Sequence, residues 1–364
     1  MKNIYEFLKN LKNEKRVKEC QLLIVNDDRQ AQIASDIVSF LGFKPFVLSD
    51  FRANFGDDLL SFSDELQDIT KTLSSYYSYK KLDKILISPI RTISYPLPKE
   101  KCFDSFTINF ADTIKIDELK SKLYNWGYYF VDIVTSEGEV SIRGDIIDIC
   151  PLGSEFGFRV SLFDNEVESI RKFDIEDQKS SKEEIETFSI NPAFLALDDE
   201  ALEQINEKID SISSDAFIKD IHSLGFWYLD NLGEYLPQNL SSFITQDALE
   251  ELEEVYVFEE KRINKDKFLV TPQIYNSKNY QEIAPANVKE FISFHKEKKI
   301  TIISGTEAKV KGYDLDLNDK KIKYIFENYI LNLVSNDEVI ISLNKEIKKR
   351  RKKKVKLVLD ELQL

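Results

Sequence analysis

The sequence predicts a multidomain chain of mixed α/β and α+β class. Its 364 residues suffice for two or three domains, and 42% are apolar while 31% are charged, so each domain can bury a core. Near both ends, apolar runs alternate with helical patterns, which indicates parallel sheets. Between them, short strand patterns follow one another, and five of the eleven glycines lie within residues 127–157. This middle region predicts an antiparallel sheet.

The first α/β unit begins with QLLIV (21–25), an apolar run typical of a buried strand. Candidate helix caps follow at residues 26–28, and apolar residues then recur at helical spacing up to Gly42. A second helical pattern covers residues 57–82, and KILISPIRTI (84–93) predicts a second buried strand. Strands that alternate with helices are typical of nucleotide-binding domains.

Such a domain needs a phosphate loop, GxxxxGK[ST], whose backbone N–H groups and lysine hold the phosphates. The chain contains no Gly-Lys dipeptide and no GxGxxG, and Lys71-Thr72 lacks a preceding glycine. GxSxG and HExxH are also absent, and His222 and His295 are the only histidines. The sequence therefore predicts no catalytic residues, no bound cofactor and no enzyme activity for this chain.

Charge and cysteine content argue against several further classes of protein. The net charge is −14, but residues 345–356 (KEIKKRRKKKVK) hold nine basic residues and one acid, so the rest of the chain is strongly acidic and would repel phosphate backbones. Cys20, Cys102 and Cys150 are far apart, which argues against disulfides and zinc and favours a reducing cytoplasm. No apolar run is long enough for a membrane span.

The C-terminal third predicts a further small α/β block. Residues 247–262 form an acidic helical pattern whose charges are expected to face solvent. VKEFISFH (288–295) predicts a helix, KITIISG (299–305) a strand, and YILNLVSNDEVIISL (329–343) a hairpin.

Alternation within the middle region separates a buried from an exposed face. In FRVSLF (158–163), Arg159 and Phe163 fall on one side while the aliphatic residues fall on the other, and Arg143 in EVSIR (139–143) follows the same rule. An exposed phenylalanine between arginines is the composition of a binding surface. The alternative is a phenylalanine covered by its own module, with the arginines paired to local acids.

Residues 137–180 (EGEVSIRGDIIDICPLGSEFGFRVSLFDNEVESIRKFDIEDQKS) closely resemble the domain shared by the excision-repair helicase UvrB and the transcription-repair-coupling factors. The common pattern is approximately GE-x-x-x-RGD-x-x-D-x-(F/L)-P, followed by an R-x-x-(F/L)-F strand and Q-(R/K)-S/T. In both families this domain docks onto UvrA. The resemblance implies that Arg143, Arg159 and Phe163 contact UvrA, with Arg171 as a weaker addition.

The chain resembles the coupling factors better than UvrB. UvrB carries a phosphate loop and a tyrosine-rich hairpin, neither of which is present here. The segment SLGFWYLDNLGEYLP (223–237) resembles the one that resumes the first domain after the docking insertion. The family's RNA-polymerase-binding domain would begin about where LDELQL ends the chain. Cys150, Leu162 and Asn165 depart from the family pattern, where Phe, Phe and an acid are common.

The resemblance implies a degenerate UvrB/helicase-like α/β domain with an inserted antiparallel-sheet docking domain, plus a small C-terminal α/β domain. The expected boundaries are 1–112 and 193–264 for the first domain, 113–192 for the UvrA-binding insertion, 265–344 for the small domain and 345–364 for a basic linker. The two parts of the first domain are expected to share a core.

The implied function is recruitment of UvrA, which links RNA polymerase stalled at DNA lesions to nucleotide excision repair. Full-length family members are ATP-dependent DNA translocases, so ATP, magnesium, RNA polymerase and double-stranded DNA are expected only for domains beyond this chain. A UvrB-like helicase fragment and a DNA-binding protein acting through the basic tail remain alternatives. The basic run itself could be a linker helix, a contact to acidic surfaces of the motor, or a DNA contact.

The face assignment also predicts how variants behave. Phe163→Ala and Arg159→Glu are expected to weaken UvrA binding and to leave the melting temperature nearly unchanged, because both positions are expected to be exposed. Val160→Ala, on the buried side, is expected to do the reverse.

Overall fold

The computed structural model describes residues 1–16, 21–53, 62–94, 97–98, 100–200, 202–203, 207, 242–258 and 272–344. The predicted basic linker and the segment 223–237 lie outside these residues. Contacts divide the chain into two compact units, residues 3–277 and residues 278–364. In the described part of the chain, no helix has both the length and the apolar character needed to cross a bilayer.

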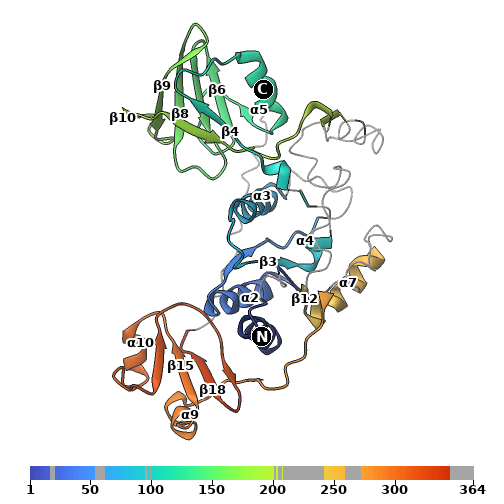
Figure 1. Cartoon of the computed structure of the whole chain (residues 1–364), viewed down its shortest axis with the longest axis vertical. Coiled ribbons are helices and arrows are strands. Elements are labelled where there is room, and N and C mark those ends of the chain that lie inside the picture. The colour runs from blue at the N-terminus through green and yellow to red at the C-terminus, as the bar shows by residue number, and fades with distance from the viewer. Residues whose placement is uncertain are drawn as a thin grey trace, which may run out of the picture. The chain divides into compact units, whose positions relative to one another are not determined.

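The first unit contains a parallel sheet with strand order β13-β12-β1-β3-β2. Two of its strands, β3 and β12, are labelled in Figure 1. Its strands come from two distant parts of the chain, and β1 joins them, because Leu23 pairs with Phe243 on one side and with Ile87 on the other. The bounds are β1 Leu22–Val25, β2 Lys44–Val47, β3 Lys84–Pro89, β12 Ser242–Ile244 and β13 Pro272–Gln273.

Helices accompany this parallel sheet. In α2, the Asp27 side chain accepts a hydrogen bond from the Gln30 N–H, and Gly42 follows the helix at φ +85°, a conformation that favours glycine. Apolar residues of α3 and α7 share one core with β1 and β3. The helices are α1 Lys2–Asn13, α2 Asp28–Phe40, α3 Ser63–Ser78, α4 Ile90–Ser94 and α7 Gln246–Phe258.

The strand predicted over residues 84–93 is shorter in the structure. It ends at Pro89, and the chain continues directly into α4. Ile90 and Ile93 are both buried, and they lie one helical turn apart. An apolar run of this length fits a buried strand or a buried helix equally well, so the pattern alone could not place the junction.

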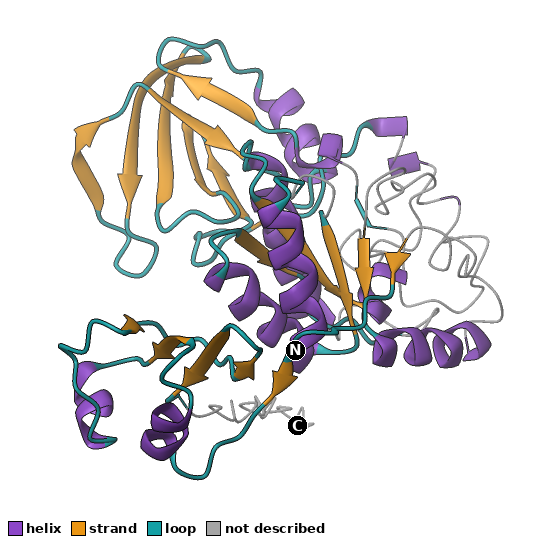
Figure 2. Ribbon diagram, turned by 60° about the horizontal axis from the view of Figure 1, so that its bottom comes forward, coloured by secondary structure: helices purple, strands orange, loops and turns teal. Residues whose placement is uncertain are grey.

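The second sheet of this unit belongs to a central module, which we define as residues 106–190. Its strands form a sheet in the order β10-β9-β8-β7-β6-β5, antiparallel apart from the β5–β6 pair. Figure 2 shows the twist of this sheet. The bounds are β5 Tyr129–Phe130, β6 Glu139–Arg143, β7 Ile146–Cys150, β8 Gly157–Phe163, β9 Glu166–Phe173 and β10 Ser180–Glu184.

One face of this six-stranded sheet is covered by helix α5 (Ile116–Asn125) and by the pair β4 (Phe106–Asn109) and β11 (Thr187–Ile190). The resulting core contains Leu119 and Leu123 of α5, Ile108 of β4 and the inward-facing aliphatic residues of β6 to β9. The module therefore begins earlier than residue 113, since β4 pairs with β11 and contributes to this core.

Two tight hairpin turns lie at the same end of the sheet. The β6–β7 turn contains Gly144 at φ +60°, and the β8–β9 turn contains Asp164 and Asn165 at φ +50° and +68°. Positive φ at both central residues is typical of type I′ turns, and Asn tolerates it well. Asn165, where the family commonly has an acid, therefore fits this turn.

The second unit is a small α/β fold with strand order β14-β17-β18-β15-β16. Strand β15 runs parallel to both neighbours, and β17 and β18 form the hairpin expected within residues 329–343. The elements are β14 Gln281–Glu282, α9 Val288–Phe294, β15 Lys299–Ile303, α10 Glu307–Gly312, β16 Ile322–Ile325, β17 Leu333–Val334 and β18 Glu338–Ser342. Strand β13, by contrast, pairs with β12 of the first unit.

Candidate partner-docking face

The four predicted contact residues lie on one face of the central module, the face opposite α5. Arg159 pairs directly with Asp148 of β7 and with Arg171 of β9, and directly paired residues project to the same side of a sheet. Arg143 pairs with Ile146, and Phe163 continues the alternation of β8 two residues beyond Ser161. We call this surface the outer face; its residues are Arg143, Ile146, Asp148, Arg159, Ser161, Phe163 and Arg171.

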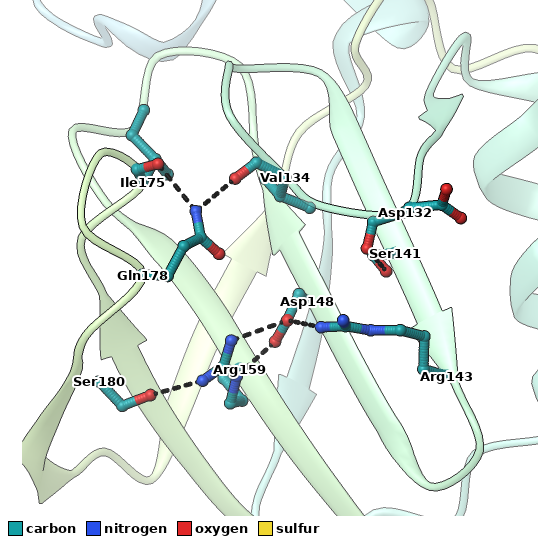
Figure 3. A network of polar contacts seen from close by, with 9 residues as sticks. All are labelled: Asp132, Val134, Ser141, Arg143, Asp148, Arg159, Ile175, Gln178 and Ser180. Carbon is teal, nitrogen blue, oxygen red and sulfur yellow. Dashed lines mark hydrogen bonds and ion pairs between the residues drawn. The ribbon is translucent and has the colours of Figure 1, made fainter.

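A buried carboxylate organises the centre of the outer face (Figure 3). The Arg159 Nε and Nη2 groups donate to Asp148 Oδ1 and Oδ2 at 2.7 and 2.9 Å, and Arg143 Nη2 donates to Asp148 Oδ2 at 3.0 Å. Arg159 Nη1 also donates to Ser180 Oγ at 3.0 Å. The side chain of Asp148 is only 2% exposed. One carboxylate thus holds two guanidinium groups, one of them in a bidentate pair.

The two arginines have different environments. The Arg159 side chain is 27% exposed, its guanidinium lies 5.1 Å from the centre of the Phe173 ring, and its hydrogen bonds to Asp148 raise its pKa. The Arg143 side chain is 56% exposed. The expectation that Arg159 is an exposed position is therefore wrong, and the unchanged melting temperature expected for Arg159→Glu loses its basis. Arg159 is anchored in the sheet, whereas Arg143 extends toward solvent.

Phe163 and Ile146 supply the apolar part of the outer face. Phe163 is 74% exposed and Ile146 is 41% exposed. Ile146 pairs with Ser161, so it is the diagonal cross-strand neighbour of Phe163, a spacing that an aromatic side chain can bridge. Phe163 is not covered by its own module in the described part of the chain. Sequence reasoning missed Ile146, although the alternation of β7 placed it on the arginine side.

Arg171 lies at the margin of the outer face. Its guanidinium pairs with Glu184 of the edge strand β10 at 2.5 Å, and both side chains are about half exposed. An exposed ion pair of this kind contributes little to stability. The Arg171–Glu184 pair continues the row that Asp148 and Arg159 begin, so the row crosses β7, β8, β9 and β10.

At the end of the sheet far from the hairpin turns, two loops cover the outer face. Cys150 projects from the outer side of β7, but it is buried with Val134 and Phe173, and burial raises the pKa of its thiol to about 11. Gln178 Nε2 donates to the carbonyl oxygens of Val134 and Ile175, which fixes the two covering loops (Figure 3). The open part of the outer face is therefore the end that carries Arg143, Ile146 and Phe163.

Comparison with known proteins shows which sequences this chain is similar to. Residues 106–195 match the model of the UvrB interaction domain. Over 350 residues, 94% of this chain, the sequence is 32% identical to the transcription-repair-coupling factor of Helicobacter pylori (strain ATCC 700392 / 26695) and covers 34% of it. The chain belongs to the transcription-repair-coupling factor family. The resemblance predicted from residues 137–180 is confirmed.

Two further coupling factors match shorter parts of the chain. The Bacillus subtilis (strain 168) protein is 34% identical over 197 residues, which are 52% of this chain and 16% of that protein. The Escherichia coli (strain K12) protein is 34% identical over 140 residues, which are 36% of this chain and 12% of that protein. The chain spans about a third of the length of the Helicobacter relative. The UvrB interaction domain match starts at residue 106, the first residue of β4.

The first domain has the layout of a nucleotide-binding domain but lacks the phosphate-loop residues. Where a phosphate loop would follow β1, Asp27 caps α2, and Asp28 Oδ1 accepts a hydrogen bond from the Asp50 N–H. Burial raises the pKa of the Asp50 carboxyl, which accepts a hydrogen bond from Arg52 Nε at 2.5 Å. The glycines and the lysine of a phosphate loop are absent from the segment that follows β1, so these residues do not fit ATP. Within the described ranges, no group of three or more His, Cys, Asp or Glu side chains could hold a metal ion.

Proposed function

We propose that this chain recruits UvrA through the outer face of the central module. The observation that carries the proposal is the convergence of Arg143, Arg159 and Phe163 on one face of a module that matches the UvrB interaction domain. Ile146 extends the apolar part, and Arg171 contributes at the margin. In the longer protein, this recruitment would link stalled RNA polymerase on double-stranded DNA to excision repair, with ATP-driven translocation supplied by other domains.

The chemistry of the outer face specifies the surface it fits. Phe163 and Ile146 offer exposed apolar area beside guanidinium groups that bind carboxylates through planar, paired N–H donors. Aromatic residues and arginines are the residue types that dominate binding energy at protein interfaces. UvrA is therefore expected to present a small apolar depression bordered by acidic side chains.

Phe163→Ala tests the proposal directly. Truncation of a central anchor costs about 2 kcal/mol or more, so the affinity of the chain for purified UvrA should fall by roughly thirtyfold or more. Titration calorimetry or interferometry with the 364-residue chain measures this. The melting temperature should stay nearly constant, because Phe163 is largely exposed.

The matched control is Phe294→Ala, which removes a phenylalanine that is also highly exposed but lies in the second unit. Its affinity for UvrA should equal that of the wild type. Wild-type affinity in the Phe163→Ala variant, or an equal loss in both variants, would contradict the proposed docking face.

A further inference from the structure

We infer that Asp148 is a positioning residue for partner binding: it holds Arg143 and Arg159 in the arrangement that the outer face presents. This inference rests on the proposed function, because it concerns how the same face is kept ready for UvrA. Asp148 itself is too deeply buried to contact a partner, at 2% exposure. Any effect on binding must therefore pass through the two arginines.

The strand register explains why one carboxylate reaches both arginines. Asp148 lies directly opposite Arg159 on β8 and opposite Ser141 on β6, and Arg143 is two residues along β6 on the same side. The Arg143 side chain extends back along its strand to Asp148 (Figure 3). The three groups come from three neighbouring strands, so the sheet fixes their relative positions.

The charges explain why the arrangement needs the acid. Arg143 on β6 and Arg159 on β8 flank β7, and their guanidinium groups repel each other; the Asp148 carboxylate on β7, between them, offsets this repulsion. Each guanidinium has five N–H donors. In the described contacts, Arg143 uses one of these donors and Arg159 uses three. Both groups thus keep donors for partner carboxylates while their orientation is fixed.

A fixed orientation favours binding because long side chains otherwise lose rotamer freedom on association. Without Asp148, Arg143 would have to be ordered by the partner alone. Arg159 would keep its position over Phe173 and its bond to Ser180, but would lose its bidentate anchor. Replacing the carboxylate should therefore weaken binding even though every exposed residue of the outer face is unchanged.

The main test is Asp148→Asn in the 364-residue chain, with affinity for purified UvrA as the readout. The amide has the shape of the carboxylate without its charge, and we expect binding to become about tenfold weaker. The same substitution is then made in a background with Arg143→Met and Arg159→Met. There, Asp148→Asn should change the affinity by less than about twofold, since the groups through which it acts are gone.

Comparing Asp148→Asn in the two backgrounds distinguishes a positioning role of Asp148 from a purely structural one. If Asp148→Asn weakens binding by the same factor in both backgrounds, the inference is overturned. Asp148→Glu is a second variant that keeps the carboxylate in case the amide does not fold, and its affinity should lie between those of wild type and Asp148→Asn. Wild-type affinity in both Asp148 variants would equally overturn the inference.

Two further variants distinguish the inference from the proposed function. Val160→Ala destabilises the same sheet from its core face, so it shows what a loss of stability alone does to binding; a tenfold loss there would remove the basis of the inference. If Phe163→Ala weakens binding and Asp148→Asn does not, only the role of Asp148 fails. If Phe163→Ala binds like wild type, the docking face fails, and the role of Asp148 fails with it.

Discussion

The carboxyl edge of the parallel sheet and the outer face of the central module both gather aspartates and arginines, yet with opposite results. At the edge, Asp27 caps α2, and Asp28 accepts a hydrogen bond from the backbone N–H of Asp50. On the outer face, Asp148 is buried and forms ion pairs with Arg143 and Arg159, whose side chains are partly exposed. The first arrangement serves the local fold, and the second orients the arginines of the proposed docking face.

The difference shows that a domain can have the fold of a ligand-binding domain without the residues that bind the ligand. Open α/β sheets bind ligands beyond the carboxyl ends of their strands, and the first domain has this layout. Its residues nevertheless lack what a phosphate group requires. The fold of the central module suggests no ligand site, but its side chains form the outer face that we propose as a docking surface. Function therefore has to be argued from the residues of the site and not from the fold.

Arg159→Glu has the largest expected effect on stability and tests the anchored role of Arg159. It removes the hydrogen bonds to Asp148 and places a second carboxylate beside a buried one, so the free energy of unfolding of the central module should fall by about 3–5 kcal/mol. Urea denaturation followed through Trp126, which lies in the module core, measures this once Trp227 is replaced by Phe.

Arg143→Glu is the matched control, because Arg143 is largely exposed and its loss leaves the bidentate pair intact. Its cost should be clearly smaller than that of Arg159→Glu, because an exposed glutamate at position 143 can turn into water, away from Asp148. Equal destabilisation by the two variants would show that the distinction between an anchored and an extended arginine is wrong.

Val160→Ala should have the next largest effect and contrasts the two sides of β8. Val160 is completely buried in the core under α5, and truncation removes the equivalent of two methylene groups and leaves a cavity, at a cost of about 2 kcal/mol. The same Trp126 assay measures it. The affinity of the folded variant for UvrA should match the wild type, the opposite pattern to Phe163→Ala. A large loss of affinity would mean that core packing, not the outer face, controls binding.

The sequence supported the face assignment because alternation along a strand is local. Period two alone places Val160 inward and Phe163 outward, and the structure has both in these positions. The role of Phe163 at an interface stays a prediction. The anchoring of Arg159 was not predictable in this way, since its pairing with Asp148 depends on the register between β7 and β8. An acid inside the otherwise apolar run IIDIC was the signal that could have indicated it.

Long-range pairing also explains the limits of the boundary predictions. Strand β4 belongs to the central module because it pairs with β11, which comes after the whole six-stranded sheet in the chain. Strand β13 similarly joins β12 across the segment between them. Neither pairing leaves a local pattern in the sequence. The domain boundaries predicted from composition therefore differ by several residues from the ends of the paired strands. The hairpin of β17 and β18, by contrast, is a local element and was confirmed.

The smallest expected effect concerns nucleotide and completes the comparison. Ligand binding raises stability by an amount set by the ratio of ligand concentration to Kd, so 1 mM ATP with a Kd of about 10 µM would add about 2.7 kcal/mol, or roughly 5–10 °C in Tm for a domain of this size. We expect less than about 1 °C, because Asp27, Asp28 and Asp50 occupy the edge where phosphates would lie. Thermal denaturation with and without magnesium ATP measures the shift, and sodium sulfate at equal ionic strength controls for salt. A rise of several degrees that ATP causes and sulfate does not would restore a nucleotide site to the first domain, and the two regions would then no longer differ in the way described above.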